Sequence, residues 1–222
     1  MNESLKEILK FVIPAQIINF IRKYNSDKQL ASWPKHQIQN DHVEGAKLIA
    51  NRHELLKLMP NNGIVAELGV DKGLFSQQIV EICNPRKLHL IDIWASARFN
   101  ETKAMNVKET FKEKIENDSI LIHRQLSTEV VNDFEDNYFD WIYIDTSHTY
   151  KTTLEELNSY SQKIKPGGLI AGHDYTMGNW LLGTKYGVIE AVTEFCVTKG
   201  WKFVYLTADY TENCSFVITR IK

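Results

Sequence analysis

The sequence lacks the features that mark several large classes of protein. Its 222 residues include only three cysteines, Cys83, Cys196 and Cys214, and no C-x-x-C pair. This number and spacing indicate neither a disulfide framework nor a cysteine-based zinc site. We therefore expect reduced thiols and a cytoplasmic protein.

Long apolar runs and a strong net charge are also missing. No stretch approaches the roughly 18 consecutive apolar residues of a membrane span, and Glu3 and Glu7 stand where a signal peptide would be basic. A formal net charge of −2 argues against a nucleic-acid-binding surface. With 43% hydrophobic residues, the chain has enough apolar material for one domain with its own core.

An apolar helical pattern opens the chain. Ser4 and Glu7 match a capping box, and apolar residues recur at helical spacing from Leu5 to Ile21. We predict one or two helices over residues 4–23, divided at Pro14. Their apolar face would cover the main domain, a second copy of the chain in a homodimer, or a membrane surface. Of these, packing within the protein or in a dimer is our expectation.

The segment that follows connects these helices to the main domain. Residues 25–41 are polar and contain Pro34, so we predict a linker. Residues 42–58 are predicted to be helical. We accordingly divide the chain into an N-terminal helical extension, residues 1–55, and a main domain, residues 56–222.

From Ile64 onward, candidate strands alternate with candidate helices. This alternation predicts a Rossmann-like α/β fold with a seven-stranded, mostly parallel sheet and helices on both faces. Too few residues separate the last two strands for a helix, so they should form an antiparallel hairpin. The predicted strands are residues 64–68, 87–92, 120–123, 140–145, 169–172, 202–206 and 215–219, and the predicted helices are residues 73–83, 103–116, 151–164 and 187–198.

A glycine-containing turn joins the first of these strands to its helix. Gly69 and Gly73 allow tight backbone geometry and close approach of a ligand. The turn ends without Gly-Lys-Ser/Thr, and Asp71 breaks a G-x-G-x-x-G pattern, so it is neither a phosphate loop nor a typical dinucleotide fingerprint. The carboxylate of Glu67 would repel a pyrophosphate and suit a positively charged ligand such as an ammonium or a sulfonium.

An acidic residue ends the next strand. Asp92 lies 19 residues after Gly73, where a carboxylate can accept hydrogen bonds from ribose hydroxyls. Because Asp92 is in register with the glycine turn, the two features together indicate a ribose-binding site more strongly than either does alone.

These residues carry a family resemblance. The set Glu67-x-Gly69-x-x-x-Gly73 followed by Asp92 resembles the cofactor half of class I S-adenosylmethionine-dependent methyltransferases. Later segments are similar to the small-molecule methyltransferases of the methyltransferase domain 24 type. These are Asp140-Trp141-Ile142-Tyr143-Ile144-Asp145-x-x-His148-x-Tyr150, Lys165-Pro166-Gly167-Gly168, Gly172-His173-Asp174-Tyr175 and Gly187-Val188-x-x-Ala191-Val192-x-x-Phe195.

The resemblance implies a cofactor, S-adenosyl-L-methionine, and a small-molecule acceptor, more often a hydroxyl. It implies that the backbone around Gly69 holds the methionine part and that Asp92 holds the ribose. It also suggests that the turn at Gln125, Leu126 and Ser127 edges the adenine. Trp94 could cover the adenine face or belong to the core. We count Glu67, Gly69, Gly73, Asp92, Trp94, Ser127 and Asp145 as candidate cofactor residues.

Two polar groups should meet at the carboxyl ends of the fourth and fifth strands. Asp145 ends the fourth strand with His148 three residues on, and His173 and Asp174 end the fifth. Asp145, His173 and Asp174 could hold a divalent cation such as Mg²⁺, as in catechol O-methyltransferase-like enzymes. His173, however, stands where such an enzyme has an acid, and Mg²⁺ prefers oxygen ligands.

Without a metal, His148 or His173 would act as the general base. His148, His173 and Asp174 are therefore the candidate catalytic residues. Residues 175–186, rich in glycine and aromatic side chains, are predicted to be a substrate loop or lid.

Two other functions are alternatives to a methyltransferase for a fold of this kind. An NAD-dependent oxidoreductase of the short-chain type needs Tyr-x-x-x-Lys near its cofactor, and the only such spacing, Tyr24 to Lys28, lies upstream of the glycine turn. A protein that binds the cofactor without catalysing a reaction would show the same glycine turn and Asp92.

Overall fold

The computed structural model describes residues 14–179, 183–209 and 211–221. Contacts within the chain define two units, residues 1–35 and residues 36–222. In the first unit, α2 (Ala15–Ser32) is one uninterrupted helix. The helix predicted before Pro14 lies outside the described residues.

The prediction that residues 25–41 form a linker is wrong for its first part. α2 begins after Pro14, whose carbonyl accepts hydrogen bonds from the amides of Ile17 and Ile18 at 2.9 and 3.3 Å. The helix then continues to Ser32, because no glycine or proline interrupts it. It ends before Trp33-Pro34, where the proline disfavours helical geometry in the preceding residue.

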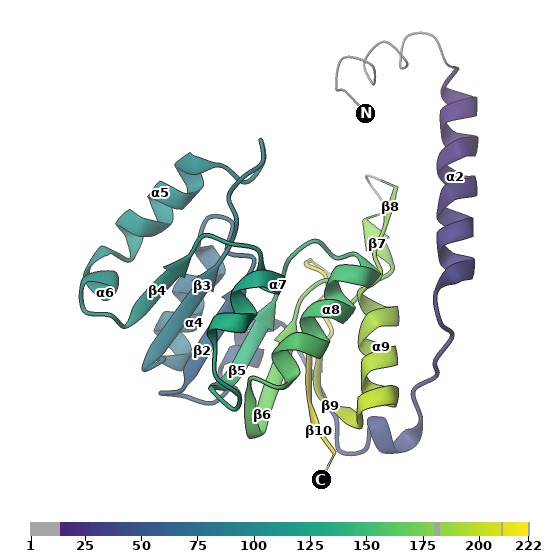
Figure 1. The fold of residues 1–222 in the computed structure, drawn as a ribbon. Coiled ribbons are helices and arrows are strands. Elements are labelled where there is room, and N and C mark those ends of the chain that lie inside the picture. The colour runs from purple at the N-terminus through teal and green to yellow at the C-terminus, as the bar shows by residue number, and fades with distance from the viewer. Residues whose placement is uncertain (1–13, 180–182, 210, 222) are drawn as a thin grey trace. The chain divides into compact units, whose positions relative to one another are not determined.

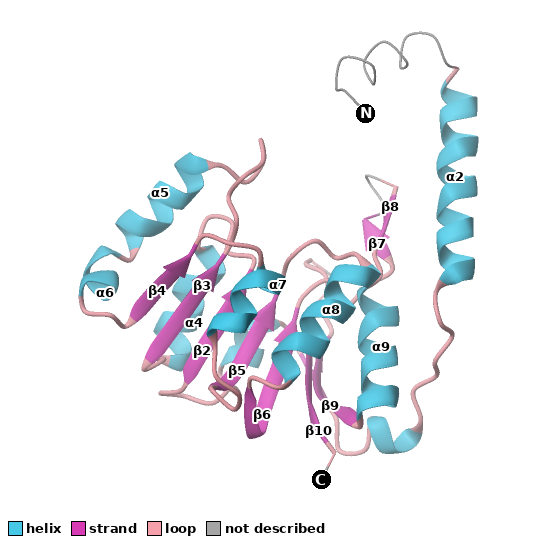
Figure 2. Cartoon of the chain, viewed as in Figure 1, coloured by secondary structure: helices cyan, strands magenta, loops and turns pink. Residues whose placement is uncertain are grey.

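The second unit is built on an eight-stranded sheet with strand order β1-β9-β10-β6-β5-β2-β3-β4 (Figure 1, Figure 2). Its strand pairs are parallel except those of β10, which runs antiparallel to both β6 and β9. This confirms the predicted Rossmann-like sheet with its antiparallel C-terminal strand. The strands are β1 (Lys47–Ile49), β2 (Ile64–Leu68), β3 (Lys87–Ile91), β4 (Ile120–His123), β5 (Phe139–Ile144), β6 (Ile164–Gly172), β9 (Trp201–Thr207) and β10 (Phe216–Arg220).

The eighth strand comes from a segment that was predicted to be helical. Residues 42–58 instead contain β1, which pairs in parallel with β9 and extends the sheet at its edge. The 3₁₀ turn η1 (Asn40–His42) precedes it and the short helix α3 (Arg52–Leu56) follows it. Gly45 at φ +76° and the capping residue Asn51 interrupt any longer helix. The structure therefore divides the chain after Lys35 and not near residue 55.

Helices cover both faces of the sheet and bury a core on each. One core gathers side chains from α7, α8 and α9, and the other gathers side chains from α3, α4 and α5. Within the described residues, no helix is long and apolar enough to cross a membrane. The remaining elements are α4 (Leu74–Cys83), α5 (Glu101–Thr110), α6 (Lys112–Glu116), α7 (Ser127–Val130), η2 (Val131–Asp133), α8 (Tyr150–Ser161), α9 (Val188–Lys199) and a small hairpin of β7 (Gly178–Asn179) and β8 (Thr184–Lys185).

The strand order has a topological switch point at the centre of the sheet. β2 lies between β3 and β5, and the crossovers from β2 lead one way while those from β5 lead the other. Open α/β sheets bind ligands at such a switch point, beyond the carboxyl ends of the strands. The glycine turn follows β2 there, and Asp145 follows β5.

Candidate active site

The turn between β2 and α4 packs directly against the end of β5. Gly69 has φ +88°, and a Cβ atom there would lie 1.9 Å from the backbone oxygen of Asp145. Gly73, at φ +75°, would bring a Cβ within 3.2 Å of the Val107 side chain. Both positions therefore require glycine, as the sequence predicted, although the close neighbours here are the protein's own atoms.

The Asp92 carboxylate holds this turn in shape. One carboxylate oxygen accepts hydrogen bonds from the amides of Val70 and Asp71 at 2.9 and 3.0 Å, and the other accepts one from the amide of Trp94 at 3.0 Å. A carboxylate offers about four acceptor positions. Asp92 can therefore organise the turn and still accept a hydrogen bond from a ribose hydroxyl.

Glu67 lies inside the sheet and not at the surface of the crevice. Its side chain is buried in β2 and accepts a hydrogen bond from the Ser76 hydroxyl. Burial raises the pKa of Glu67 to about 8, because little compensates for desolvation of the carboxylate. At neutral pH this carboxyl is therefore mostly protonated, so it offers a ligand less negative charge than the sequence suggested.

The predicted adenine contacts differ in their exposure. Trp94 is only 2% exposed, and its indole N–H donates to the carbonyl of Asp71 at 2.9 Å. Trp94 therefore packs beneath the glycine turn as part of the core. Nothing in its position favours the predicted contact with the adenine face. The aliphatic side chains of Ile93 and Leu126 are 42% and 45% exposed on the turns after β3 and β4, and such apolar surfaces can flank a planar base.

Ser127 faces a buried carboxyl. Its hydroxyl donates to one oxygen of Glu156 at 2.5 Å, and the hydroxyl of Thr146 donates to the other at 2.8 Å. Glu156, on α8, is fully buried, and burial raises its pKa to about 7. It joins the loop after β4 to the loop after β5, so Ser127 is held as part of the scaffold.

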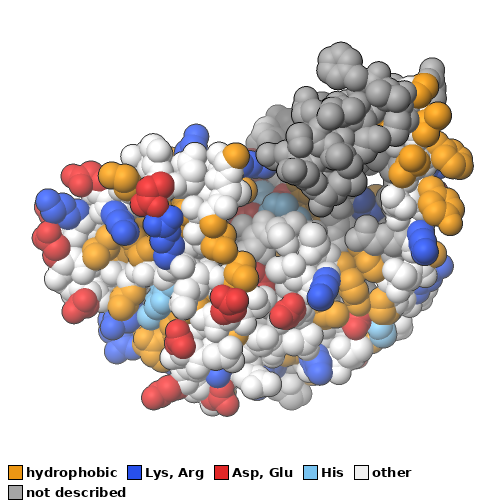
Figure 3. All heavy atoms as spheres, turned by 45° about the horizontal axis from the view of Figure 1, so that its top comes forward, with side chains coloured by type: hydrophobic (Ala, Val, Ile, Leu, Met, Phe, Trp, Pro, Cys, Tyr) orange, Lys and Arg blue, Asp and Glu red, His pale blue; other side chains and the backbone are white. Residues whose placement is uncertain are grey.

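Asp145, His148 and Asp174 converge beyond the ends of β5 and β6. Nδ1 of His148 lies 3.0 Å from a carboxylate oxygen of Asp174. One ligand atom from each of the three side chains can be chosen so that all lie within 4.8 Å of one another. Figure 3 shows this edge of the molecule, with a histidine and acidic side chains in a recess. The sequence therefore placed Asp145 and Asp174 together correctly.

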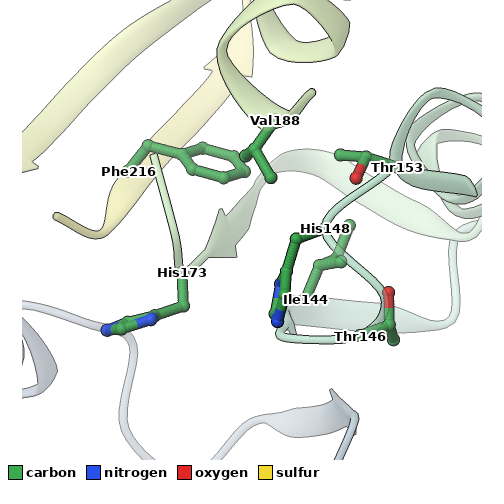
Figure 4. A pocket seen from close by; sticks show the side chains of 7 residues that line it. All are labelled: Ile144, Thr146, His148, Thr153, His173, Val188 and Phe216. Carbon is green, nitrogen blue, oxygen red and sulfur yellow. The ribbon is translucent and has the colours of Figure 1, made fainter. Parts of the chain in front are cut away.

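The histidine of this cluster is His148 and not His173, which corrects the predicted metal set. In Figure 4 the ring of His173 points away from His148. Nδ1 of His173 is 3.4 Å from Asp174, and its buried Nε2 has no hydrogen-bond partner among the described residues. His148 and His173 line a small hollow together with Ile144, Thr146, Thr153, Val188 and Phe216.

Neighbouring residues hold His148 in a defined orientation. His148 and Asp174 adopt left-handed backbone conformations, with φ +56° and +55°, which are uncommon for such residues and occur often at functional sites. The Tyr186 ring lies 4.8 Å from the imidazole, centroid to centroid. The carbonyl of His148 accepts a hydrogen bond from the amide of Gly187 at 2.9 Å, and through Tyr186 the predicted substrate loop contacts this histidine.

The electrostatic environment favours an ion pair between His148 and Asp174. Burial by itself would lower the pKa of His148, but the hydrogen bond and charge of Asp174, with the charge of Asp145, raise it above the ordinary value. Burial would raise the pKa of Asp174, but contacts with His148 and His173 hold it well below its usual range. Burial raises the pKa of Asp145 despite the two histidines.

Arg52 lies near Asp145 and interacts with it electrostatically, and the sequence reasoning did not single it out. It is the first residue of α3, in a segment assigned to the N-terminal extension. Its guanidinium pairs with Glu212 and lies 4.9 Å from the centre of the Phe75 ring. No local pattern reveals this, because the contacts join residues far apart in the sequence. Tyr186 was within the predicted loop and Glu156 within a predicted helix. No sequence pattern indicated that Tyr186 packs on His148 or that Glu156 joins two loops.

The fold has counterparts among solved structures. A Corynebacterium glutamicum protein aligns over 99% of this chain and 97% of its own, with 11% identity and a TM-score of 0.57. Precorrin-6y C5,15-methyltransferase from Geobacter metallireducens aligns over 76% of this chain and 86% of its own, with 10% identity and a TM-score of 0.56. The pyocyanin biosynthetic protein PhzM covers 76% of this chain and 54% of its own, with 11% identity and a TM-score of 0.58.

At these low sequence identities the solved structures show only that the fold is shared. The match of the sequence to a family model indicates the family. Residues 66–175 match the family model described as a methyltransferase domain, while a search of curated proteins finds no match. The matched segment contains the glycine turn, Asp92 and the His148–Asp174 pair.

The chain is therefore a class I S-adenosylmethionine-dependent methyltransferase. Its matched segment places it in the methyltransferase domain 24 family, which confirms the resemblance seen in the sequence. The family implies S-adenosylmethionine as the cofactor, and the oxidoreductase alternative is left without support.

Proposed function

We propose that this enzyme transfers the methyl group of S-adenosylmethionine to a hydroxyl group of a small molecule, with His148 as the general base. The observation that carries the proposal is the His148–Asp174 pair, 3.0 Å apart, beside the glycine turn. A carboxylate that binds one imidazole nitrogen fixes the tautomer and leaves the other nitrogen to accept a proton.

The cofactor would lie across the carboxyl ends of β2, β3 and β4. Asp92 would accept a hydrogen bond from the ribose, and Ile93 and Leu126 would flank the adenine. Gly69 and the backbone of Asp145 would border the methionine part, because these two segments are in contact. When bound, S-adenosylmethionine supplies an electrophilic methyl group on a sulfonium.

The protein's own contribution is to position the acceptor and to take its proton. His148 would accept the hydroxyl proton as the new oxygen–carbon bond forms and the carbon–sulfur bond breaks, giving a methyl ether and S-adenosylhomocysteine. Asp174, which accepts a hydrogen bond from Nδ1 of the neutral imidazole, would stabilise the imidazolium that forms, and the proton would then pass to water. General-base catalysis of this kind contributes about 10²–10⁴-fold to a rate.

The segment from Tyr175 to Tyr186 would recognise the acceptor. Tyr186 packs on His148, and Met177 and the β7–β8 hairpin lie between β6 and α9. Met177 is 61% exposed, which suits contact with an apolar part of a substrate.

A metal-assisted version of the reaction is the second candidate, because Asp145, His148 and Asp174 are close enough to share an ion. Two carboxylates and one imidazole suit Mn²⁺, Fe²⁺ or Zn²⁺ better than Mg²⁺, which prefers oxygen ligands. These three residues would hold the ion, which would lower the pKa of the acceptor hydroxyl. His148 would then have to exchange its bond with Asp174 for a bond to the metal.

For the first unit we propose association with a second copy of the chain. Ile17, Phe20, Ile21 and Tyr24 recur at helical spacing on α2, and each is at least 47% exposed. Such an apolar row on one helix face is typical of helix–helix contacts.

The experiment that tests the proposed function measures S-adenosylhomocysteine formation with a panel of phenols, sugars and other hydroxylated small molecules. Methyl ether products are identified by mass spectrometry. His148→Ala should lose at least about a hundredfold in rate, whereas the control His53→Ala, an exposed histidine on α3, should keep full activity. Full activity of His148→Ala would contradict the proposed base, and activity lost on chelation and restored by Mn²⁺ would favour the metal version.

A further inference from the structure

Arg52 is a cation near the place where we propose that the cofactor, itself a sulfonium cation, binds. The N-cap residue Asn51 accepts a hydrogen bond from the Glu54 amide at 2.9 Å, which fixes the start of α3. The Arg52 side chain then extends over the Phe75 ring, next to the glycine turn, and is 23% exposed. A cation beside a site for a positively charged cofactor is unfavourable unless it meets an anion.

The contacts of Arg52 brace its guanidinium without using all of its donors. Nε and one terminal nitrogen bind the two carboxylate oxygens of Glu212 at 2.6 and 3.1 Å. A guanidinium has five N–H groups, so three remain beyond the Glu212 contacts among the described residues, and the nearby Tyr143 hydroxyl can take one of them. The others are available to a carboxylate, the group that arginine binds best.

The carboxyl groups around Arg52 belong to the two segments proposed to border the methionine part, and of these groups Glu67 is mostly protonated at neutral pH. Arg52 interacts electrostatically with Asp145, after β5, and with Glu67, at the end of β2. The site thus brings the Arg52 guanidinium and the Asp145 carboxyl close enough to interact. This pattern is complementary to an α-amino acid, whose carboxylate and ammonium carry the opposite charges.

We propose that Arg52 is a cofactor-binding residue whose guanidinium, braced by Glu212 and Phe75, binds the carboxylate of the methionine part of S-adenosylmethionine. The inference rests on the proposed placement of the cofactor between Gly69 and Asp145. Arg52 therefore recognises the amino-acid end of the cofactor, and Glu212 acts as a positioning residue through it.

Calorimetric titration with three ligands tests this assignment. S-adenosylhomocysteine carries the carboxylate, decarboxylated S-adenosylmethionine lacks it, and 5′-methylthioadenosine lacks the whole amino-acid group. The wild-type protein should bind S-adenosylhomocysteine. Arg52→Gln should weaken that binding about tenfold to a hundredfold, the usual effect of losing a charge-assisted contact. The same variant should bind decarboxylated S-adenosylmethionine and 5′-methylthioadenosine as the wild-type protein does.

Two further variants show whether the effect is specific to the guanidinium of Arg52. Arg52→Lys keeps the charge without the guanidinium and should fall between the wild type and Arg52→Gln. The control Arg220→Gln changes an arginine that contacts the Ser161 carbonyl on another part of the sheet, and should bind all three ligands normally.

The outcomes separate this inference from the proposed function. An Arg52→Gln protein that binds S-adenosylhomocysteine normally, or loses all three ligands equally, would overturn the role of Arg52 while leaving the cofactor assignment in place. A wild-type protein that binds none of the three would overturn the cofactor placement itself. If Arg52→Gln does not fold, the wild-type preference for S-adenosylhomocysteine over the decarboxylated ligand decides, and equal affinity for the two refutes the assignment.

Discussion

The buried carboxyl of Glu67 allows a quantitative test of the electrostatics under the cofactor turn. The change is Glu67→Gln, which keeps the size of the side chain and an oxygen that can accept the Ser76 hydrogen bond. The pKa of this group is about 8 in the folded protein, against an ordinary value of 4.5. As pH rises from 4.5 to 8, the unfolded chain loses this proton and the folded protein keeps it.

The folded state is therefore progressively destabilised over that pH window. Each pH unit above the unfolded pKa costs about 1.4 kcal/mol, so at pH 7 the cost is about 3 kcal/mol in the free energy of unfolding. Glutamine does not ionise and removes this cost. For a chain of this length, 3 kcal/mol corresponds to a rise in Tm of about 6–12 °C.

Thermal unfolding followed by circular dichroism measures the effect. The Tm of Glu67→Gln should be close to that of the wild-type protein near pH 4.5 and clearly higher at pH 7.5. The control Glu81→Gln changes an exposed glutamate on α4. The difference between its Tm and that of the wild-type protein should not grow between pH 4.5 and pH 7.5. If Glu67→Gln were less stable than the wild type at pH 7.5, Glu67 would be ionised in the fold and the reasoning would be refuted.

Three further predictions concern the site and the first unit. Asp92→Ala should weaken binding of S-adenosylhomocysteine about tenfold to a hundredfold in calorimetry and lower Tm, because the same carboxylate holds the glycine turn; normal affinity in a folded protein would contradict the ribose contact. Asp174→Asn should lower the pKa of His148, so the acid limb of the pH profile of kcat/KM should move to lower pH while the rate falls; an unmoved limb would exclude His148 as the titrating base. Removal of residues 1–32 should halve the mass measured by light scattering, and an unchanged mass would exclude the dimer.

Most of the sheet could be predicted from the sequence because its strands are short apolar runs between polar turns. β2 and β4 have the bounds expected from the pattern; β2 lies in the middle of the sheet, and β4 pairs in parallel with β3 at its edge. β1 could not be predicted in this way. A strand of three residues has no measurable period, and it exists because the exposed edge of β9 offers it hydrogen bonds.

The choice between His148 and His173 also lay beyond the sequence. His173 and Asp174 follow the end of β6, and the left-handed backbone of Asp174 departs there from the extended geometry that a strand pattern assumes. The left-handed backbone of His148 then turns its ring toward Asp174. Arg52 was missed for a related reason, since its partners Phe75 and Glu212 are distant in the chain.

The contact between Gly69 and the backbone of Asp145 has a consequence for engineering this enzyme. The glycine turn after β2 packs directly on the strand end that leads to His148, and no space remains between them for even a methyl group. A library that varies both segments independently will mostly yield misfolded or inactive proteins. New acceptors should instead be sought by varying residues 175–186, which contact the imidazole through Tyr186 and leave that shared wall intact.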